Sequence, residues 1–278
     1  AKLSLSDSQS KILRYGNPTG SLSKYVEGEL IGNIYGYTTI GIAKTDEEMQ
    51  QHLASLPNGG QSALGSQWAA GDIMYADLNG DGKINNGSYT INDMGDMKKI
   101  GNSTPRFMTG INLDAAYKGW DLQMFWQGVL KRDWWPGDKN MTFWGVTDGE
   151  WWSTSFKEHL DYFRTSENPL GENLNSYYPR PIFNTKNNKS QTRYLQNAAY
   201  MRLKNIQVGY TFPKVWINKL MLQNLRIFVS GENLLTITSL SDTMDPETCG
   251  AGYQSTEQAN GTVYPLAKTI SFGLSVNF

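Results

Sequence analysis

The chain has 278 residues, a length that corresponds to one large domain or two small ones. Lys and Arg number 25 against 26 Asp and Glu, a net charge of -1. Nucleic-acid binders and polybasic membrane-surface proteins are therefore disfavoured, because both need a cationic excess. Aromatic residues make up 12% and charged residues only 18%, which indicates a folded chain. No apolar run approaches the 18 residues of a membrane helix, so a membrane-spanning chain of this kind would have to use strands.

The first strands expected in chain order are at about 9–15 and 27–42. The next two, 106–117 and 120–130, alternate between apolar and polar residues, which is the pattern of a strand with two different faces. Only Lys118 and Gly119 separate them, and glycine tolerates the positive φ of a hairpin turn. The sequence therefore predicts an antiparallel hairpin here.

Three further strands are predicted in the second half of the chain. In the strand from about 199 to 211 the apolar parity slips, which predicts a β-bulge near Lys204 and Asn205. A short helix starting at Pro213 is expected before the strand from Asn224 to about Thr236. The strand from 269 to 278 alternates perfectly and ends in a large aromatic residue, with one face formed by Ile270, Phe272, Leu274, Val276 and Phe278.

The connections between these strands alternate in length. The segments 131–197 and 238–267 are long, whereas 118–119 and 212–223 are short. Long and short connections at opposite ends of an antiparallel meander are typical of outer-membrane barrels. A soluble β-sandwich stays open as an alternative, although its connections are usually all short.

The strongest local motif, DLNGDGKIN, resembles an EF-hand-type calcium loop. Gly82 permits the sharp turn and Ile84 would anchor the loop to a core. Ser88 stands where such loops carry a bidentate acid, and Asp93 or Asp96 could replace that acid. The alternative is an empty turn held by side-chain-to-backbone hydrogen bonds. The expected Ca²⁺ ligands are Asp77, Asn79, Asp81, the Lys83 carbonyl, Asn85 and Asp93.

The long central connection is rich in tryptophan. Exposed indole rings stack on sugar rings or anchor a partner, whereas buried ones would form a loop core or an interfacial belt. The candidates for contact with a substrate or partner are Trp134, Trp135, Trp144, Trp151 and Trp152.

Catalytic patterns are weak. The pairs Asp148 with Glu150 and Glu158 with Asp161 could serve glycoside hydrolysis, but acidic pairs this close are common on solvated loops. The sequence contains no G-x-S-x-G, Walker A or H-E-x-x-H motif. We therefore expect no enzymatic activity.

Several motifs, in family order over nearly the whole chain, resemble the SusC/RagA-type TonB-dependent outer-membrane transporters. They are the segments IGNIYGY from Ile31, GDI from Gly71 through DLNGDGKI, IGNSTPRF from Ile100, FWQG from Phe125, YMRLKNIQVGY from Tyr200, VSGENL from Val229 and the strand ending in Phe278.

This resemblance implies that residues 1–278 are a C-terminal segment of a barrel of about 22 strands, without the plug domain and earlier strands. It implies active import of oligosaccharides or peptides across the outer membrane of a Gram-negative bacterium. The partners would be a SusD-like surface lipoprotein and the TonB complex, and Phe278 would belong to the barrel-assembly signal.

The fold expected is all-β: an open antiparallel meander, completed by strands outside this chain, with long extracellular loops. With Phe278 in the periplasm, the segments 131–197 and 238–267 and the aspartate loop are extracellular. The competing hypothesis is a secreted, calcium-stabilised β-sandwich that binds carbohydrate.

Overall fold

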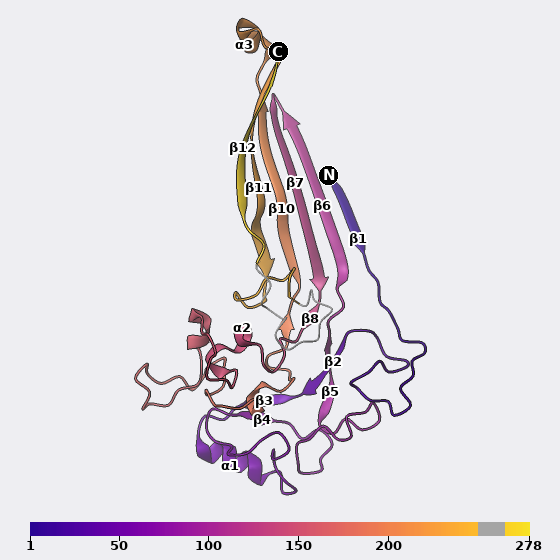
Figure 1. Ribbon diagram of the computed structural model, residues 1–278, viewed down its shortest axis with the longest axis vertical. Coiled ribbons are helices and arrows are strands. Elements are labelled where there is room, and N and C mark those ends of the chain that lie inside the picture. Colours follow the sequence, from indigo (N-terminus) through magenta and orange to yellow (C-terminus); the bar gives the residue numbers. More distant parts are fainter. Residues whose placement is uncertain (250–264) are drawn as a thin grey trace.

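The computed structural model describes residues 1–249 and 265–278. A six-stranded antiparallel sheet forms the upper part in Figure 1, and a layer of loops and short elements lies at its lower end. We call this layer, residues 7–105 and 132–199, the loop layer. The strands of the sheet are β1 (Lys2–Ser6), β6 (Arg106–Tyr117), β7 (Trp120–Lys131), β10 (Tyr200–Thr211), β11 (Asn224–Thr238) and β12 (Thr269–Asn277).

The strand order is β1-β6-β7-β10-β11-β12, so β1 and β12 are the two edges. Neither edge has a second neighbour among the described residues, and the remaining strands there form only two-stranded ribbons. The expected open antiparallel sheet is therefore confirmed, and no second large sheet faces it within the described ranges. This arrangement is not that of the competing β-sandwich.

The local features predicted at the strand ends are present. Lys118 and Gly119 have φ values of 47° and 89° and form the turn between β6 and β7. The registers of β10 with both neighbours shift between Leu203 and Asn205, which is the expected bulge. Pro213 caps the short helix α3 (Lys214–Ile217), and a 3₁₀ turn follows at Asn218–Leu220. Both short connections lie at the end of the sheet opposite the loop layer (Figure 1).

The two N-terminal strand predictions are wrong. Residues 9–15 contain only an isolated bridge between Lys11 and Leu30, and the first sheet strand is β1 instead. The segment 27–42 contains two short strands, β2 (Asn33–Tyr37) and β3 (Thr39–Ile42), which do not join the large sheet. The pairing breaks at Thr38, between the two strands, and each ribbon also has a register shift, at Ile34/Tyr35 in β2 and at Thr39/Gly41 in β3.

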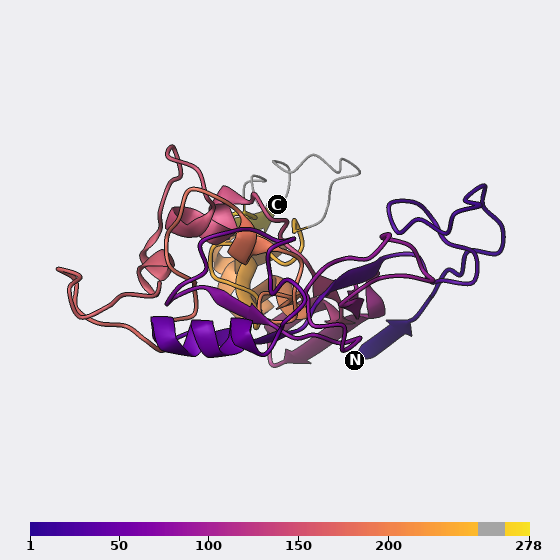
Figure 2. The same ribbon diagram turned by 90° about the horizontal axis from the view of Figure 1, so that it is seen from below.

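The loop layer is built from three ribbons and several short helices. β2 pairs with β5 (Met97–Asn102), β3 with β4 (Ile73–Tyr75), and β8 (Asp133–Trp134) with β9 (Gln196–Asn197). The helices are α1 (Asp46–Ala54), α2 (Met141–Trp144) and 3₁₀ turns at Gly145–Thr147, Lys157–Leu160 and Lys186–Asn188. The segment between β1 and β2 extends sideways, away from α1, in both overall views (Figures 1 and 2). None of the described helices is both long and apolar enough to cross a bilayer.

The hydrophobic core lies mainly in the loop layer and not on the sheet. Its fully buried members include Tyr75, Phe143, Trp144 and Tyr194. The Asp72 carboxylate is buried beside them and accepts hydrogen bonds from Arg180, Lys186 and Asn187. Burial raises the pKa of Asp72, but the cationic and amide donors outweigh it and leave the pKa below its ordinary value. These contacts join segments more than 100 residues apart and give the loop layer a fixed shape.

Candidate functional site

One face of the sheet is apolar in row after row across the strands. The register aligns Ala115, Leu122, Val208, Val229 and Phe272 in one row. The next row towards α3 contains Tyr117, Trp120, Tyr210, Ile227 and Leu274. Many of these side chains are exposed, and Phe272 is 81% exposed. An uncovered apolar face of this extent marks contact with another apolar phase or partner.

The opposite face of the same strands is polar. The row between the two apolar ones contains Ala116, Asp121, Gly209, Phe228 and Gly273. The adjacent polar row contains Asp114, Gln123, Gln207, Ser230 and Ser271. The alternation of apolar and polar residues predicted for the last strand is thus shared by the neighbouring strands, with the same side apolar in each. A barrel wall with lipid outside and water inside has this alternation.

The polar face also holds a connection in place through a charge cluster that the sequence analysis missed. Arg202 on β10 donates two hydrogen bonds of 2.9 Å to the Asp245 carboxylate, and both side chains are buried. Lys204 lies 3.1 Å from Glu247. No local pattern links residues 43 positions apart, so the pairing could be found only in three dimensions.

The aspartate loop brings three carboxylates together. One oxygen each of Asp77, Asp81 and Asp96 lies within 4.8 Å of the others. Asp77 accepts the N–H groups of Gly80 and Gly82 at 2.7 and 2.9 Å. Ile84 is fully buried, as expected for the residue that anchors the loop.

Asp96 is buried between the two ends of this loop. Its carboxylate accepts N–H groups from Leu78 at 2.9 Å and Asn85 at 2.8 Å. Burial raises the pKa of Asp96, and the nearby Asp77 charge adds to this. The pKa of Asp77 is lowered, because hydrogen bonds from Gly82 and Gly80 outweigh the effect of burial.

The prediction of Asp93 as the last ligand does not fit this geometry. Its carboxylate accepts the Ser88 N–H at 2.8 Å and hydroxyl at 2.6 Å, and a Gly95 N–H at 3.3 Å. Asp93 therefore caps its own turn, and Asp96, the other candidate, joins the cluster. The Asn85 side-chain oxygen likewise accepts the Gly87 N–H at 2.6 Å. The Lys83 ammonium lies 3.8 Å from Asp81.

The five tryptophans divide into two groups. Trp134 and Trp144 are buried in the loop layer, and Trp135 packs against them with its ring 6.1 Å from that of Trp144. Burial does not fit the predicted ligand contact of Trp134 and Trp144. The ring of Trp144 packs against those of Phe143, Tyr178 and Tyr194. Trp151 and Trp152 are exposed, and their rings meet edge to face at 5.2 Å.

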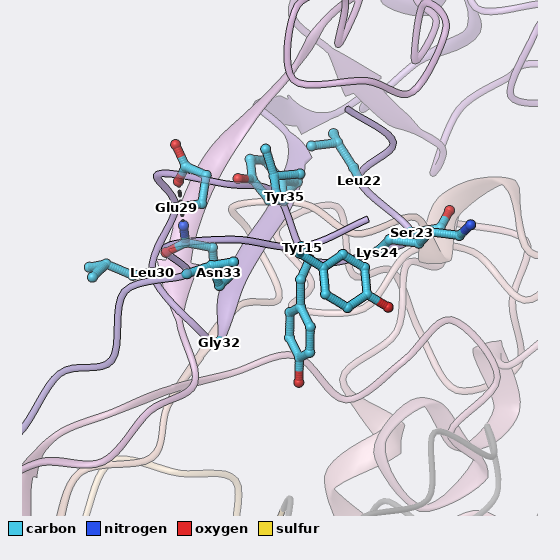
Figure 3. A pocket seen from close by; sticks show the side chains of 12 residues that line it. Tyr15, Leu22, Ser23, Lys24, Glu29, Leu30, Gly32, Asn33 and Tyr35 are labelled. Carbon is cyan, nitrogen blue, oxygen red and sulfur yellow. Dashed lines mark hydrogen bonds between the residues drawn. The ribbon is translucent and has the colours of Figure 1, made fainter. Parts of the chain in front are cut away.

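A pocket of about 330 Å³ lies in the sideways segment before β2 (Figure 3). Tyr15, Tyr25 and Tyr35 line it together with Glu29 and Asn33. Glu29 accepts a hydrogen bond of 2.6 Å from the Asn33 amide and pairs with Lys99 at 2.5 Å. The sequence analysis missed this pocket, because its lining comes from a segment that was predicted as strands.

The acidic pairs considered for catalysis have structural partners. Asp148 is buried and accepts hydrogen bonds from the Glu150 N–H and the Ser153 hydroxyl. Asp161 accepts hydrogen bonds from the Asn173 amide and the Tyr177 N–H. Both aspartates thus hold turns of the loop layer.

Comparisons with known proteins agree with this architecture. No family model matches the chain. TonB-dependent receptor P3 of Formosa agariphila is 30% identical over 260 residues, which are 91% of this chain and 22% of that protein. The receptor P39 of the same organism is 24% identical over 283 residues, 91% of this chain and 25% of that protein. The predicted relationship to SusC/RagA-type TonB-dependent transporters is confirmed. The chain spans about a quarter of the length of these relatives.

Solved structures show the same fold. The RagAB peptide transporter matches 96% of this chain and 24% of its own, with a TM-score of 0.57 and 18% identity. The closed-closed state of the RagAB peptide importer matches 95% of this chain and 25% of its own, with a TM-score of 0.55 and 18% identity. The antiparallel sheet and its loop layer are therefore the fold of the corresponding part of such transporters.

Proposed function

We propose that this chain is part of an outer-membrane active importer of oligosaccharides or peptides in a Gram-negative bacterium. It would work with a SusD-like surface lipoprotein and draw its energy from the TonB complex. Both relatives are named TonB-dependent receptors, and the solved neighbours are named as a peptide transporter and a peptide importer. Transport is favoured over catalysis because the aspartate of each acidic pair considered above holds a turn.

The observation that carries this proposal is the difference between the two faces of the sheet. Rows of exposed apolar side chains face one way, and amide, hydroxyl and charged groups face the other. An open sheet edge in lipid would leave unpaired backbone groups that cost several kcal/mol each. The outer edges of β1 and β12 therefore require strands from the rest of a closed barrel.

The proposal is tested on the whole transporter. Heat-modifiable electrophoretic mobility and dependence on detergent are expected of a barrel. Deletion of its gene should abolish TonB-dependent uptake of either oligosaccharides or peptides, and the wild-type gene should restore it. A detergent-independent, soluble protein would overturn the proposal. Labelling of Cys249 on intact cells tests the orientation. If its buried thiol does not react, an exposed residue near it is replaced by Cys and labelled instead.

The cargo and the lipoprotein would meet the loop layer. The exposed Trp151 and Trp152 pair can stack on a sugar ring or insert into a partner surface. The tyrosine-lined pocket in Figure 3 offers aromatic faces beside Glu29 and Asn33, which suits hydroxyl-rich or peptide-like ligands. Both features lie outside the sheet, where an extracellular ligand would arrive first.

We also propose that the aspartate loop binds Ca²⁺ in a structural role. The ligands would be Asp77, Asn79, Asp81 and Asp96, with the Lys83 carbonyl. Three converging carboxylates and an apolar anchor at Ile84 support it, since Ca²⁺ takes six to eight oxygen ligands. The ion would offset most of the negative charge of the three carboxylates and hold the loop in place without taking part in chemistry.

Calcium titration of the whole transporter tests this site, with Asp96→Asn as the variant and Asp93→Asn as the matched control. The Asp96 variant should bind Ca²⁺ at least about tenfold more weakly, whereas the Asp93 variant should bind nearly as the wild type does. Equal losses in the two variants, or no calcium bound by the wild type, would reject the site.

A further inference from the structure

The connection between β10 and β11, residues 212–223, presents apolar side chains to its surroundings. Val215 is 77%, Trp216 60% and Met221 88% exposed. Ile217 is buried and fixes the turn from within. We call these residues the α3 turn; it lies beyond the end of the sheet that is opposite the loop layer, beside the C-terminus (Figure 1).

Backbone hydrogen bonds hold the α3 turn against the sheet at both of its ends. The Phe212 N–H donates to the Leu225 carbonyl at 2.9 Å, and the Gln223 N–H donates to the Asn277 carbonyl at 2.8 Å. The exposed apolar side chains are therefore presented in a defined place.

The aromatic surface of the sheet continues into this turn. Trp120 and Tyr210 have ring centroids 4.9 Å apart, and Tyr210 and Phe212 are 5.1 Å apart. Phe212 is in turn 6.4 Å from Trp216. Since Trp120 and Tyr210 belong to the apolar face, Trp216 lies on the same side as the proposed lipid contact. Aromatic residues with a polar edge favour the boundary between hydrocarbon and water.

Positive charge accompanies these rings. The α3 turn contains Lys214 and Lys219 and no Asp or Glu. Lys118 belongs to the neighbouring turn, which is held beside the end of β10 by a 2.8 Å hydrogen bond from the Thr211 N–H to the Gly119 carbonyl. Asp121, the acid nearest to Lys118 along the chain, lies on the opposite face of the sheet and is paired with Arg226. The apolar side chains are thus flanked by three lysines.

We propose that the α3 turn and Lys118 form an interfacial anchor that binds anionic phospholipid headgroups. Val215, Trp216 and Met221 would enter the boundary of the adjacent leaflet, and the lysines would contact headgroup phosphates. Apolar side chains at headgroup depth bind a membrane by burying apolar area, and lysines beside them add electrostatic attraction to anionic lipids. The inference rests on the proposed function, because the sheet must lie in a membrane. A lipid occupant is favoured over a protein because the apolar surface is continuous with the lipid-facing rows.

Spin labels on the whole transporter in phospholipid vesicles test the insertion. The labels are placed at Val215→Cys and Met221→Cys in a background in which all native cysteines of the transporter, Cys249 included, are replaced by Ser. Phe183→Cys in the loop layer is the aqueous control. Accessibility should favour oxygen over a water-soluble nickel reagent at 215 and 221, and the reverse at 183. Labels at 215 and 221 that behave like the one at 183 would overturn the anchor.

A label at Phe272→Cys separates this inference from the proposed function. If that label is in lipid while those at 215 and 221 are in water, only the anchor fails. If the label at 272 is also in water, the membrane placement of the sheet fails.

The charge component is tested by native mass spectrometry of lipids retained from vesicles with and without phosphatidylglycerol. Replacing Lys118, Lys214 and Lys219 by Gln should reduce the preference for the anionic lipid by about fivefold per lysine. The matched control replaces three loop-layer lysines, Lys44, Lys139 and Lys157, and should retain the preference. Equal retention by both triple variants would reject headgroup binding.

Discussion

Asp121 on β7 and Arg226 on β11 form a bidentate ion pair across β10, the strand between them. The Arg226 nitrogens lie 2.6 and 3.1 Å from the two Asp121 oxygens. Gly209 makes this possible, because a Cβ there would lie 2.5 Å from both charged groups. The pair therefore couples three neighbouring strands on the polar face.

Gly209→Ala should displace this ion pair without breaking the sheet, because the ends of both long side chains can move aside. In the wild type we expect Arg226→Gln to lower the free energy of unfolding by up to about 1 kcal/mol. In the Gly209→Ala background the same change should cost almost nothing. Denaturant unfolding of the whole transporter measures the free energies of this double-mutant cycle, which comprises the wild type, the two single variants and the double variant. Equal costs in both backgrounds would contradict the coupling.

Phe272 and Ser271 are adjacent on β12 and face opposite sides of the sheet. Arg in place of Phe272 would put a charge on the apolar face and should destabilise the barrel by about 2–4 kcal/mol near the bilayer midplane. Arg in place of Ser271 would face the polar side and should cost much less. Unfolding in lipid vesicles provides the comparison, and equal tolerance at the two positions would contradict the assignment of the faces.

Trp144 and Trp152 should respond differently to truncation. Trp144 is fully buried, with its ring 4.7 Å from Tyr194 and 4.9 Å from Phe143, so Trp144→Ala should cost about 3–5 kcal/mol. Trp152→Ala removes an exposed ring and should leave stability nearly unchanged while weakening cargo or lipoprotein binding. Thermal unfolding and a binding titration distinguish the two effects. A stable Trp144 variant would show that the loop layer can collapse around the cavity.

Regular alternation explains why most of the large sheet could be predicted. Residues 269–278 have one apolar face and one polar face, and this difference alone fixes a period of two. β1 has the same alternation over only five residues, too few to stand out. Residues 27–42 resemble a strand in composition, but their apolar groups serve the local packing of the loop layer.

The candidate site could be predicted only as far as local sequence determines it. The aspartate loop forms from neighbouring residues, so Asp77 and Asp81 lie together as their spacing indicates. The choice between Asp93 and Asp96 depends on how the chain returns after Ser88, and spacing does not determine that path. Burial of Trp144 likewise depends on Tyr194, which is 50 residues away.

Phe278 is expected to direct assembly, as the family resemblance implies. It ends the alternating strand and is largely exposed at the end of the sheet opposite the loop layer. Deletion of Phe278 should reduce the amount of folded transporter in the outer membrane. Heat-modifiable mobility of membrane fractions measures this, with Phe183→Ala in the loop layer as a control of similar exposure. Normal insertion after the deletion would show that Phe278 is not part of the assembly signal.

His159 should make the loop layer less stable in mild acid. Its ring is buried; Nδ1 accepts the Phe156 N–H at 2.9 Å and Nε2 donates to the Phe143 carbonyl at 3.1 Å. Burial lowers the pKa of His159 below its ordinary value of about 6.5, despite the opposing effects of the Phe143 carbonyl and Glu158. The neutral ring is therefore the folded form.

The pKa of His159 is lower in the folded protein than in the unfolded chain. The contribution of its buried neutral ring to stability is therefore fully present above pH 6.5. It declines as the pH falls below that value, because the unfolded chain binds the proton first. Hydrogen exchange of residues 140–160 at pH 7.5 and pH 5.5 should show greater opening at the lower pH. His159→Gln should reduce the pH dependence of hydrogen exchange in residues 140–160. His52→Gln, the control, should leave that dependence unchanged. An equal dependence in the wild type and the His159 variant would show that another group controls it.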